Sequence, residues 1–360
     1  MRTLSMILDL DLDSVSASNL REFRNECPSS LPMDPAAIAG AVSSILPLSN
    51  PPDQVLRLSS GEVVLSTYQS SSESQNSGLT FVSATFDSEN HVPFDHFITN
   101  DDPAPRSDII PNRPASSGRN VGNYFPRYPK GMAEMGNEIF VATSNYDEVN
   151  RDYLPGNLLA YNRSSGQFRV MRTTGYNPTS VATVIYQGQP AVLVVNSGAI
   201  DRTGAPVTES RLNLFNPSTH ALIADYGLGN VGAGVMGEVA LTPDRRRAVL
   251  PTADNSGRIL VVDLQTGTSQ SVNLRDHGAV SEQILLTQVH LSEDGRSAFV
   301  GNFNDGQLYV IDLGNPSATV QRIPVDLNTT DGDGLSDGVW RDGHFFMGVG
   351  SRLQRLNFQP

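Results

Sequence analysis

The sequence predicts an all-β fold made of one four-stranded unit that is repeated along the chain. Three observations lead to this prediction. The 360 residues include 31 Gly and 23 Pro, which is typical of many short strands joined by turns. Apolar runs are only about five residues long, and no stretch rich in Ala, Glu, Lys and Leu predicts a long helix. These runs also recur in pairs along the chain, which predicts repeats of a single unit.

The clearest part of the repeat is a pair of apolar runs separated by a polar break, as in AFVGNFNDGQLYVIDL at 298–313. The first run of each pair predicts the second strand of a unit, and its six copies are VVLST (63–67), IFVAT (139–143), VLVVN (192–196), AVLPT (248–252), AFVGN (298–302) and FFMGV (345–349). The second run predicts the third strand, and its copies end at Ser83, Asn162, Asn216, Asp263, Asp312 and Asn357.

A tight turn precedes each of these pairs and another follows it, so every unit gains a first and a fourth strand. Turn-forming pairs such as Asp294-Gly295 and Thr266-Gly267 stand at these places. A four-stranded antiparallel repeat of about 50 residues predicts a blade of a β-propeller. We expect a single propeller of six four-stranded blades, and a seventh blade within residues 1–50 is the alternative.

Three other segments complete the predicted organisation. Residues 1–14 contain the alternating stretch SMILDLDLD, which predicts a strand that completes the last blade and closes the ring. Residues 15–50 predict a partly helical excursion, and residues 51–360 predict the blades. The Pro-, Ser- and Asn-rich stretch at about 93–122 predicts an irregular loop inserted after the first blade.

The stretch from LSEDGR at 291–296 to LYVIDL resembles the YVTN type of β-propeller repeat, whose consensus S-P-D-G-x-x-V-Y-V-T-N is followed by V-x-V-I-D. The fit is good at 289–313 and 239–264, fair at 181–216 and loose elsewhere. This resemblance implies a propeller that is often secreted or surface-associated in prokaryotes and is sometimes related to lactonases. It implies no activity, because one fold hosts many functions.

Long connections are predicted on one face of the disc only. In a four-stranded meander the turns between strands one and two and between strands three and four open on one face, and these are short. The connections between strands two and three, and between blades, open on the other face and hold nearly all the long segments. Long loops on a rigid scaffold are where binding is usually found, so we expect the ligand-binding surface on this long-loop face.

Two sets of strand ends are predicted to lie near the central channel on the long-loop face. The last residues of the second strands are Thr67, Thr143, Asn196, Thr252, Asn302 and Val349. The first residues of the first strands are Gln54, Lys130, Ser180, Glu238, Gln288 and Asp337. Two roles would explain an asparagine at position 302. It could form a hydrogen bond to backbone at the strand end, or it could contact a ligand at the channel mouth.

Charge and cysteine content exclude several classes of protein. The net charge of −13, with Lys130 as the single lysine, argues against a nucleic-acid partner. One cysteine, Cys27, cannot form an intramolecular disulfide or a multi-cysteine metal site. No apolar run approaches the length of a membrane span. Asp9, Asp11 and Asp13 interrupt any signal-peptide core, although the resemblance still leads us to expect a periplasmic or extracellular protein.

One loop has the spacing of a calcium site. NTTDGDGLSDG at 328–338 resembles the Asp-rich calcium-binding repeats of thrombospondin type 3. Its candidate ligands are Asp331, Asp333, Asp337 and Thr329. The fuller motif has an aspartate at the position of Thr329. Glycines let the backbone wrap an ion that takes six to eight oxygens. A solvated acidic turn is the alternative explanation.

Aromatic residues and Arg127 predict either a partner surface on the same face or a cover for the edge of a blade. Tyr and Arg are enriched at protein contacts, and the candidates occur in predicted loops. They are Tyr124, Arg127, Tyr128, Tyr146 and Tyr153.

Two functions remain open from the sequence. The favoured hypothesis is a non-enzymatic secreted or periplasmic propeller that binds a protein, glycan or small ligand on its long-loop face, with calcium ordering that face. The alternative is a metal-dependent, lactonase-like hydrolase whose channel-mouth cation polarises a lactone carbonyl. Its candidate ligands, matched by residue type only, are Glu238, Asn196, Asn302 and Asp254.

Overall fold

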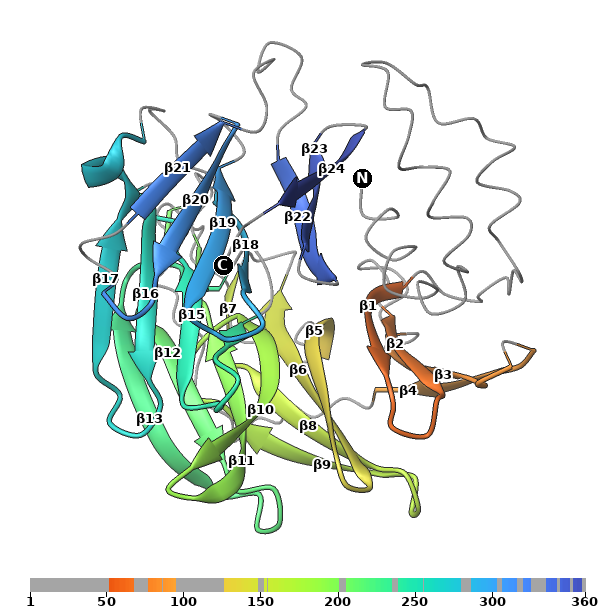
Figure 1. Ribbon diagram of the computed structural model, residues 1–360. Coiled ribbons are helices and arrows are strands. Elements are labelled where there is room, and N and C mark those ends of the chain that lie inside the picture. The colour runs from red at the N-terminus through yellow and green to blue at the C-terminus, as the bar shows by residue number, and fades with distance from the viewer. Residues whose placement is uncertain are drawn as a thin grey trace.

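The computed structural model contains six antiparallel sheets that follow one another along the chain (Figure 1). It describes residues 52–67, 77–85, 87–94, 126–147, 152–153, 155–200, 205–234, 239–254, 256–279, 286–302, 306–315, 320–324, 335–341, 344–349 and 352–357. Within these ranges the helical element is the 3-10 helix η3 (Leu274–His277), and no helix there is long and apolar enough to cross a membrane.

Each sheet is one blade, and its strands are hydrogen-bonded in chain order. Blade 1 holds β1 (Pro52–Arg57), β2 (Val63–Thr67), β3 (Gly78–Val82) and β4 (Glu89–Pro93). Blade 2 holds β5 (Pro126–Met135), β6 (Glu138–Asp147), β8 (Asn157–Asn162) and β9 (Gln167–Arg172), with β7 (Asp152–Tyr153) paired to β6. Blade 3 holds β10 (Pro178–Tyr186), β11 (Gln189–Asn196), β12 (Ser210–Phe215) and β13 (Leu222–Gly229).

Blade 4 holds β14 (Ala240–Leu241), β15 (Arg247–Pro251), β16 (Arg258–Asp263) and β17 (Ser269–Asn273). Blade 5 holds β18 (Leu286–Leu291), β19 (Ser297–Asn302), β20 (Gln307–Asp312) and β21 (Val320–Pro324). Blade 6 holds β22 (Leu335–Arg341), β23 (His344–Val349) and β24 (Arg352–Asn357). The expected β-propeller blades are therefore confirmed, and their first strands lie innermost, with β5 in contact with both β1 and β10.

Apolar side chains fill the space between consecutive blades. Along β15, Ala248 and Leu250 belong to the core shared with blade 3, whereas Val249 between them belongs to the core shared with blade 5. Successive residues of a strand point to opposite faces, and here both faces are buried. This explains why the second and third strands are continuous apolar runs, and every residue of β2 is buried in the same way.

The Asp or Asn that ends most third strands has a structural role in the turn that follows. Asn162 Oδ1 accepts hydrogen bonds from the backbone N–H groups of Ser164 and Ser165 at 3.1 and 3.0 Å. Asp263 Oδ1 accepts from the N–H groups of Gln265 and Thr266 at 2.7 and 3.1 Å. Side-chain oxygens that bind backbone two or three residues ahead shape such turns.

The turns between the first and second strands use a hydroxyl and a carboxylate. The hydroxyl of Ser292 donates to Asp294 at 2.6 Å, and the N–H of Arg296 donates to the same oxygen at 3.0 Å. These hydrogen bonds, that of Ser292 first, hold the pKa of Asp294 below its usual range. The pKa of Asp244 in blade 4 is lowered in the same way, first by Thr242.

Side chains of the short turns also link neighbouring blades. His220, in the turn after β12, makes a 2.9 Å contact with Glu138 at the start of β6. Gln265 donates to the carbonyl of Ile185 at 2.8 Å, and Arg247 donates to the carbonyl of Leu313 at 3.0 Å. Gly295 packs so closely on blade 4 that an added Cβ would lie 2.2 Å from Pro243 Cδ. Contacts between blades therefore occupy much of the short-turn face.

Three expectations lie outside the described residues. These are the ring-closing strand at 1–14, the helical excursion at 15–50 and most of the irregular insertion at about 93–122. Among the described strands, β24 pairs with β23 alone, so its other edge is where the N-terminal strand was expected.

We predict that Asp263→Ala destabilises the protein, whereas Asp263→Asn does not. Alanine removes the acceptor for two backbone N–H groups, which costs about 1 kcal/mol. Asparagine retains an acceptor, as Asn162 and Asn216 do in blades 2 and 3. Thermal unfolding should show a melting temperature lowered by a few degrees for the alanine variant only. Equal melting temperatures for both variants would contradict the assigned role.

A second prediction concerns the N-terminal strand. If residues 1–14 complete blade 6, then Leu10→Asp places a charge on the buried side of that strand and lowers the melting temperature by several degrees. Asp11→Asn, on the opposite side of the same strand, is the matched control and should leave the melting temperature unchanged. A wild-type melting temperature for Leu10→Asp would show that this segment does not pack against the blades.

Candidate functional site

The strand ends predicted to form the channel mouth are buried. Five of the six side chains are described, and each is at most 2% exposed. They are Thr67, Thr143, Asn196, Thr252 and Asn302. Val349 lies at the end of β23, where only the backbone is described. These side chains are therefore not exposed on the surface of the long-loop face.

Asn196 fixes the crossing between blades 2 and 3. Its Nδ2 donates to Asn213 Oδ1 at 3.0 Å, and Asn213 in turn donates to the hydroxyl of Thr174 at 2.8 Å. The crossing passes so close that a Cβ on Gly175 would lie 2.6 Å from the Cβ of Asn196. Within the described part of the chain, Asn196 Oδ1 is a buried oxygen without a hydrogen-bond partner. The hydroxyl of Thr143, another of these strand-end residues, is buried without a hydrogen-bond partner in the same way.

Both carboxylate oxygens of Asp254 already accept hydrogen bonds from its own loop. Its Oδ1 accepts from the hydroxyl of Thr252 at 2.8 Å and from the N–H and hydroxyl of Ser256 at 3.2 and 2.5 Å, while Oδ2 pairs with Arg258. Burial acts to raise the pKa of Asp254, but the hydrogen bonds from Ser256, Arg258 and Thr252 outweigh it and hold the pKa below 3.8. A cation bound here would have to displace a guanidinium that already neutralises the carboxylate.

The structure says less about Asn302 and Glu238, the other two candidate ligands of the hydrolase hypothesis. Asn302 ends β19, opposite Leu286 and Gln307, and its backbone carbonyl accepts from the N–H of Gly306 at 3.1 Å. Glu238 lies outside the described residues. Across the described ranges, no three His, Cys, Asp or Glu side chains gather where they could hold a metal ion.

Seven of the eleven residues of the predicted calcium loop, 328–334, lie outside the described residues. This applies to Thr329, Asp331 and Asp333, whereas Asp337 lies within β22 and only its backbone is described. The loop leads directly into the first strand of blade 6, as the sequence predicted.

The predicted partner-binding residues lie mainly in strands instead of loops. Arg127 and Tyr128 belong to β5, because the ladder between β5 and β6 extends to the pair Pro126 and Asn145. Tyr146 and Tyr153 are directly opposite each other in the pairing of β6 with β7. The backbone therefore brings two of the five candidates together at one ladder position. Tyr124 lies outside the described residues.

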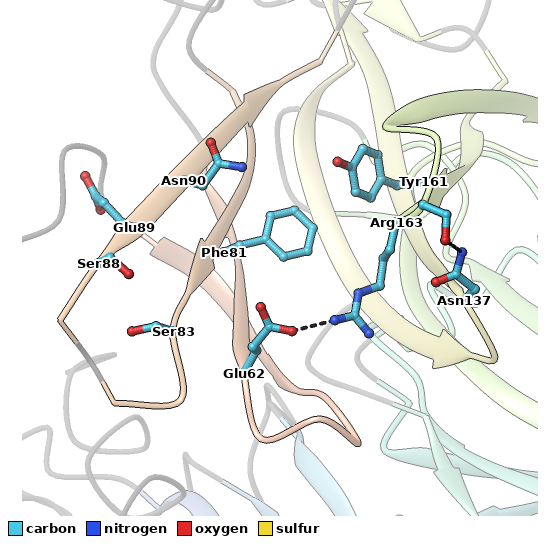
Figure 2. A pocket seen from close by; sticks show the side chains of 10 residues that line it. Glu62, Phe81, Ser83, Ser88, Glu89, Asn90, Asn137, Tyr161 and Arg163 are labelled. Atoms are coloured by element: carbon cyan, nitrogen blue, oxygen red, sulfur yellow. Dashed lines mark hydrogen bonds and ion pairs between the residues drawn. The ribbon is translucent and has the colours of Figure 1, made fainter.

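A cleft that the sequence did not predict opens between blades 1 and 2 on the short-turn face (Figure 2). Its volume is about 530 Å³, and eight of its ten lining residues are polar or charged. They are Glu62, Ser83, Ser88, Glu89, Asn90, Asn137, Arg163 and Ser164, with Phe81 and Tyr161 as the two aromatic members.

Charge pairing links the two walls of this cleft. Arg163 of blade 2 contacts Glu62 of blade 1 at 2.5 Å and Glu134 of its own blade at 3.5 Å. Glu134 also accepts from the N–H and hydroxyl of Ser59 in blade 1, at 2.7 and 3.0 Å. No sequence motif marked these residues, because the contact joins turns about 100 positions apart.

Comparisons with solved structures show the fold. The Dos1 propeller superposes with a TM-score of 0.54 at 13% identity, over 82% of this chain and 64% of that chain. A "putative 6-phosphogluconolactonase" from Bacteroides uniformis gives 0.51 at 12% identity, over 87% and 82% of the two chains. KlAtg21, solved in complex with the coiled coil of AgAtg16, gives 0.51 at 11% identity, over 83% and 78%.

This chain therefore has the fold of a multi-blade β-propeller, and it spans less than two thirds of the Dos1 propeller chain. No protein-family model matches the sequence. No curated protein matches it either.

We predict that the stabilising effect of Asp254 depends on pH. A carboxyl whose pKa is lower in the folded state stabilises the fold above its unfolded pKa, about 3.9, and loses this effect as pH falls through the folded value. The difference in melting temperature between wild type and Asp254→Asn should therefore be full at pH 7 and shrink below about pH 4. Asp276→Asn, at an exposed position of η3, is the control. A difference that is constant with pH would contradict this role.

Proposed function

We propose that the protein is a non-catalytic β-propeller of the YVTN repeat type that binds a protein, glycan or small ligand on its long-loop face, with calcium ordering that face. The observation that carries this proposal is the division between the two faces. The short turns are occupied by links between blades, such as His220 with Glu138 and Gln265 with Ile185. Nearly all the long connections leave the opposite face, and long loops on a rigid scaffold are where binding is usually found.

The polar residues considered for catalysis support a structural role. Asp254 is neutralised by Arg258, and Asn196 holds the crossing at Gly175 through Asn213. A general base or metal ligand needs a lone pair that faces the substrate, and hydrogen bonds within the loop occupy those of Asp254. We also propose that the protein acts in the periplasm or outside the cell, which agrees with the resemblance to YVTN repeats.

A lactonase-like hydrolase is the second candidate, and one observation favours it. Asn196 Oδ1 is a buried oxygen for which the described residues supply no donor, and a cation or a water molecule would satisfy it. Glu238 is the other residue that this candidate requires, because Asp254 is already paired.

Two measurements test the function directly, each with and without calcium. One is binding to a glycan and peptide array, and the other is hydrolysis of a panel of lactones. The proposal expects retention of a glycan or peptide and no lactone hydrolysis. Calcium-dependent hydrolysis that is lost in Glu238→Ala would overturn it in favour of the hydrolase.

We predict that chelator-treated protein binds one calcium ion in a calorimetric titration, and that an Asp331→Ala, Asp333→Ala double variant does not. Removing two carboxylates takes away the charge that compensates for dehydration of the ion. Glu238→Ala is the control and should bind calcium like wild type. Binding that survives the loop variant but disappears in Glu238→Ala would place the ion at the channel instead.

A further inference from the structure

We infer that the cleft between blades 1 and 2 binds a neutral saccharide. This site lies on the short-turn face and is separate from the long-loop face discussed above. Its volume of about 530 Å³ is within the usual range for small-ligand sites, about 300 to 1,000 Å³. Most such sites are lined mainly by apolar side chains, whereas this one is mainly polar, so its ligand must be hydrophilic.

One aromatic ring supplies an apolar platform within the polar surroundings. Phe81 is partly buried, and its ring centroid lies 5.4 Å from that of Tyr161. Tyr161 is only 8% exposed, so Phe81 presents the accessible aromatic surface. Figure 2 shows Phe81 and Asn90 pointing toward blade 2, and the two residues are paired across β3 and β4. The C–H face of a sugar ring packs on such a surface, and its hydroxyls reach the groups beside it.

The hydrogen-bonding groups around Phe81 suit hydroxyls. A hydroxyl both donates and accepts, so it needs partners of both kinds. Asn90 is exposed and can do both. Asn137 directs its Nδ2 to Ser164 at 2.8 Å and Asn162 at 3.3 Å, and its amide oxygen is an acceptor that these bonds do not use. Arg163 supplies donors at the base of the cleft.

The charges favour a neutral ligand. The guanidinium of Arg163 is paired with Glu62 and Glu134, so no unbalanced positive charge is left to attract a phosphate or sulfate. Glu62 Oε2 already accepts from Arg163 and from the hydroxyl of Ser60 at 2.9 Å, and Ser59 occupies Glu134. Glu89 lines the cleft but is paired with Val82, on the side of the sheet opposite Phe81, and Figure 2 shows its side chain directed away from the platform. Both carboxylates beside the platform are therefore already engaged by Arg163, Ser59 and Ser60.

The test is a titration of wild-type protein with the neutral trisaccharides maltotriose, cellotriose and laminaritriose. Binding is measured by saturation-transfer NMR and calorimetry. Trigalacturonic acid and trilysine are the charged probes. We expect at least one neutral trisaccharide to bind with millimolar or better affinity and neither charged probe to bind. Binding of a charged probe alone, or of none of the five, would overturn the inference.

Variants locate the site. Phe81→Leu keeps the apolar volume and removes the aromatic face, and Asn90→Ala removes an exposed amide, so each should weaken binding about tenfold. Ile223→Ala, at an exposed position of blade 3, is the control. The Asp331→Ala, Asp333→Ala double variant should bind the saccharide like wild type, since its loop belongs to the other face. Affinity unchanged in both cleft variants would show that the saccharide binds elsewhere and would overturn the inference.

Discussion

The structure depends on one constraint, which is that the middle strands of every blade have two apolar faces to bury. A single four-stranded sheet could cover neither face, so each blade is stable only between two others. The core clusters show this directly, because each large one is shared by consecutive blades, such as blades 4 and 5 around Val249 and Tyr309. Phe299 and Phe345 join blades 5 and 6 in the same way, with ring centroids 5.3 Å apart. Among the described residues, each pair of consecutive blades from 1 to 6 thus shares a core that excludes water.

Polar side chains have different roles on the two faces. Carboxylates, amides and hydroxyls of the short turns bind backbone N–H groups locally, as Asn162 and Asp263 do, or reach the adjacent blade, as His220 does. These contacts fix the spacing of the blades. Under the long-loop face, Asn213, which Asn196 holds in place, and Asp254 instead bind loop backbone close to the sheet ends. A residue type that looks catalytic in the sequence therefore serves the scaffold in several of its occurrences.

The sequence predicted what depends on local pattern. Continuous apolar runs identified the second and third strands, because burial on both faces leaves no polar alternation to obscure them. Turn residues placed the hairpins and the division into short and long connections. The sequence did not predict contacts between segments that are far apart in the chain. Glu62 and Phe81 belong to blade 1, Arg163 belongs to blade 2, and none carries a motif, so only the spacing of the two blades creates their cleft. The strand pairing of Tyr146 with Tyr153 was expected to be loop, since a two-residue strand such as β7 leaves no periodicity.

The seam between blades 1 and 2 also has a mechanical consequence. Atoms that border a cleft lose the dispersion contacts they would make in a packed interface, so the two sheets resist separation less along that part of the seam. Ion pairs take over there, and their strength falls as ionic strength rises. Blades 4 and 5 are joined mainly by apolar side chains, which salt does not screen. Blades 1 and 2 also share an apolar cluster, so rising salt weakens only the ion-paired part of their seam.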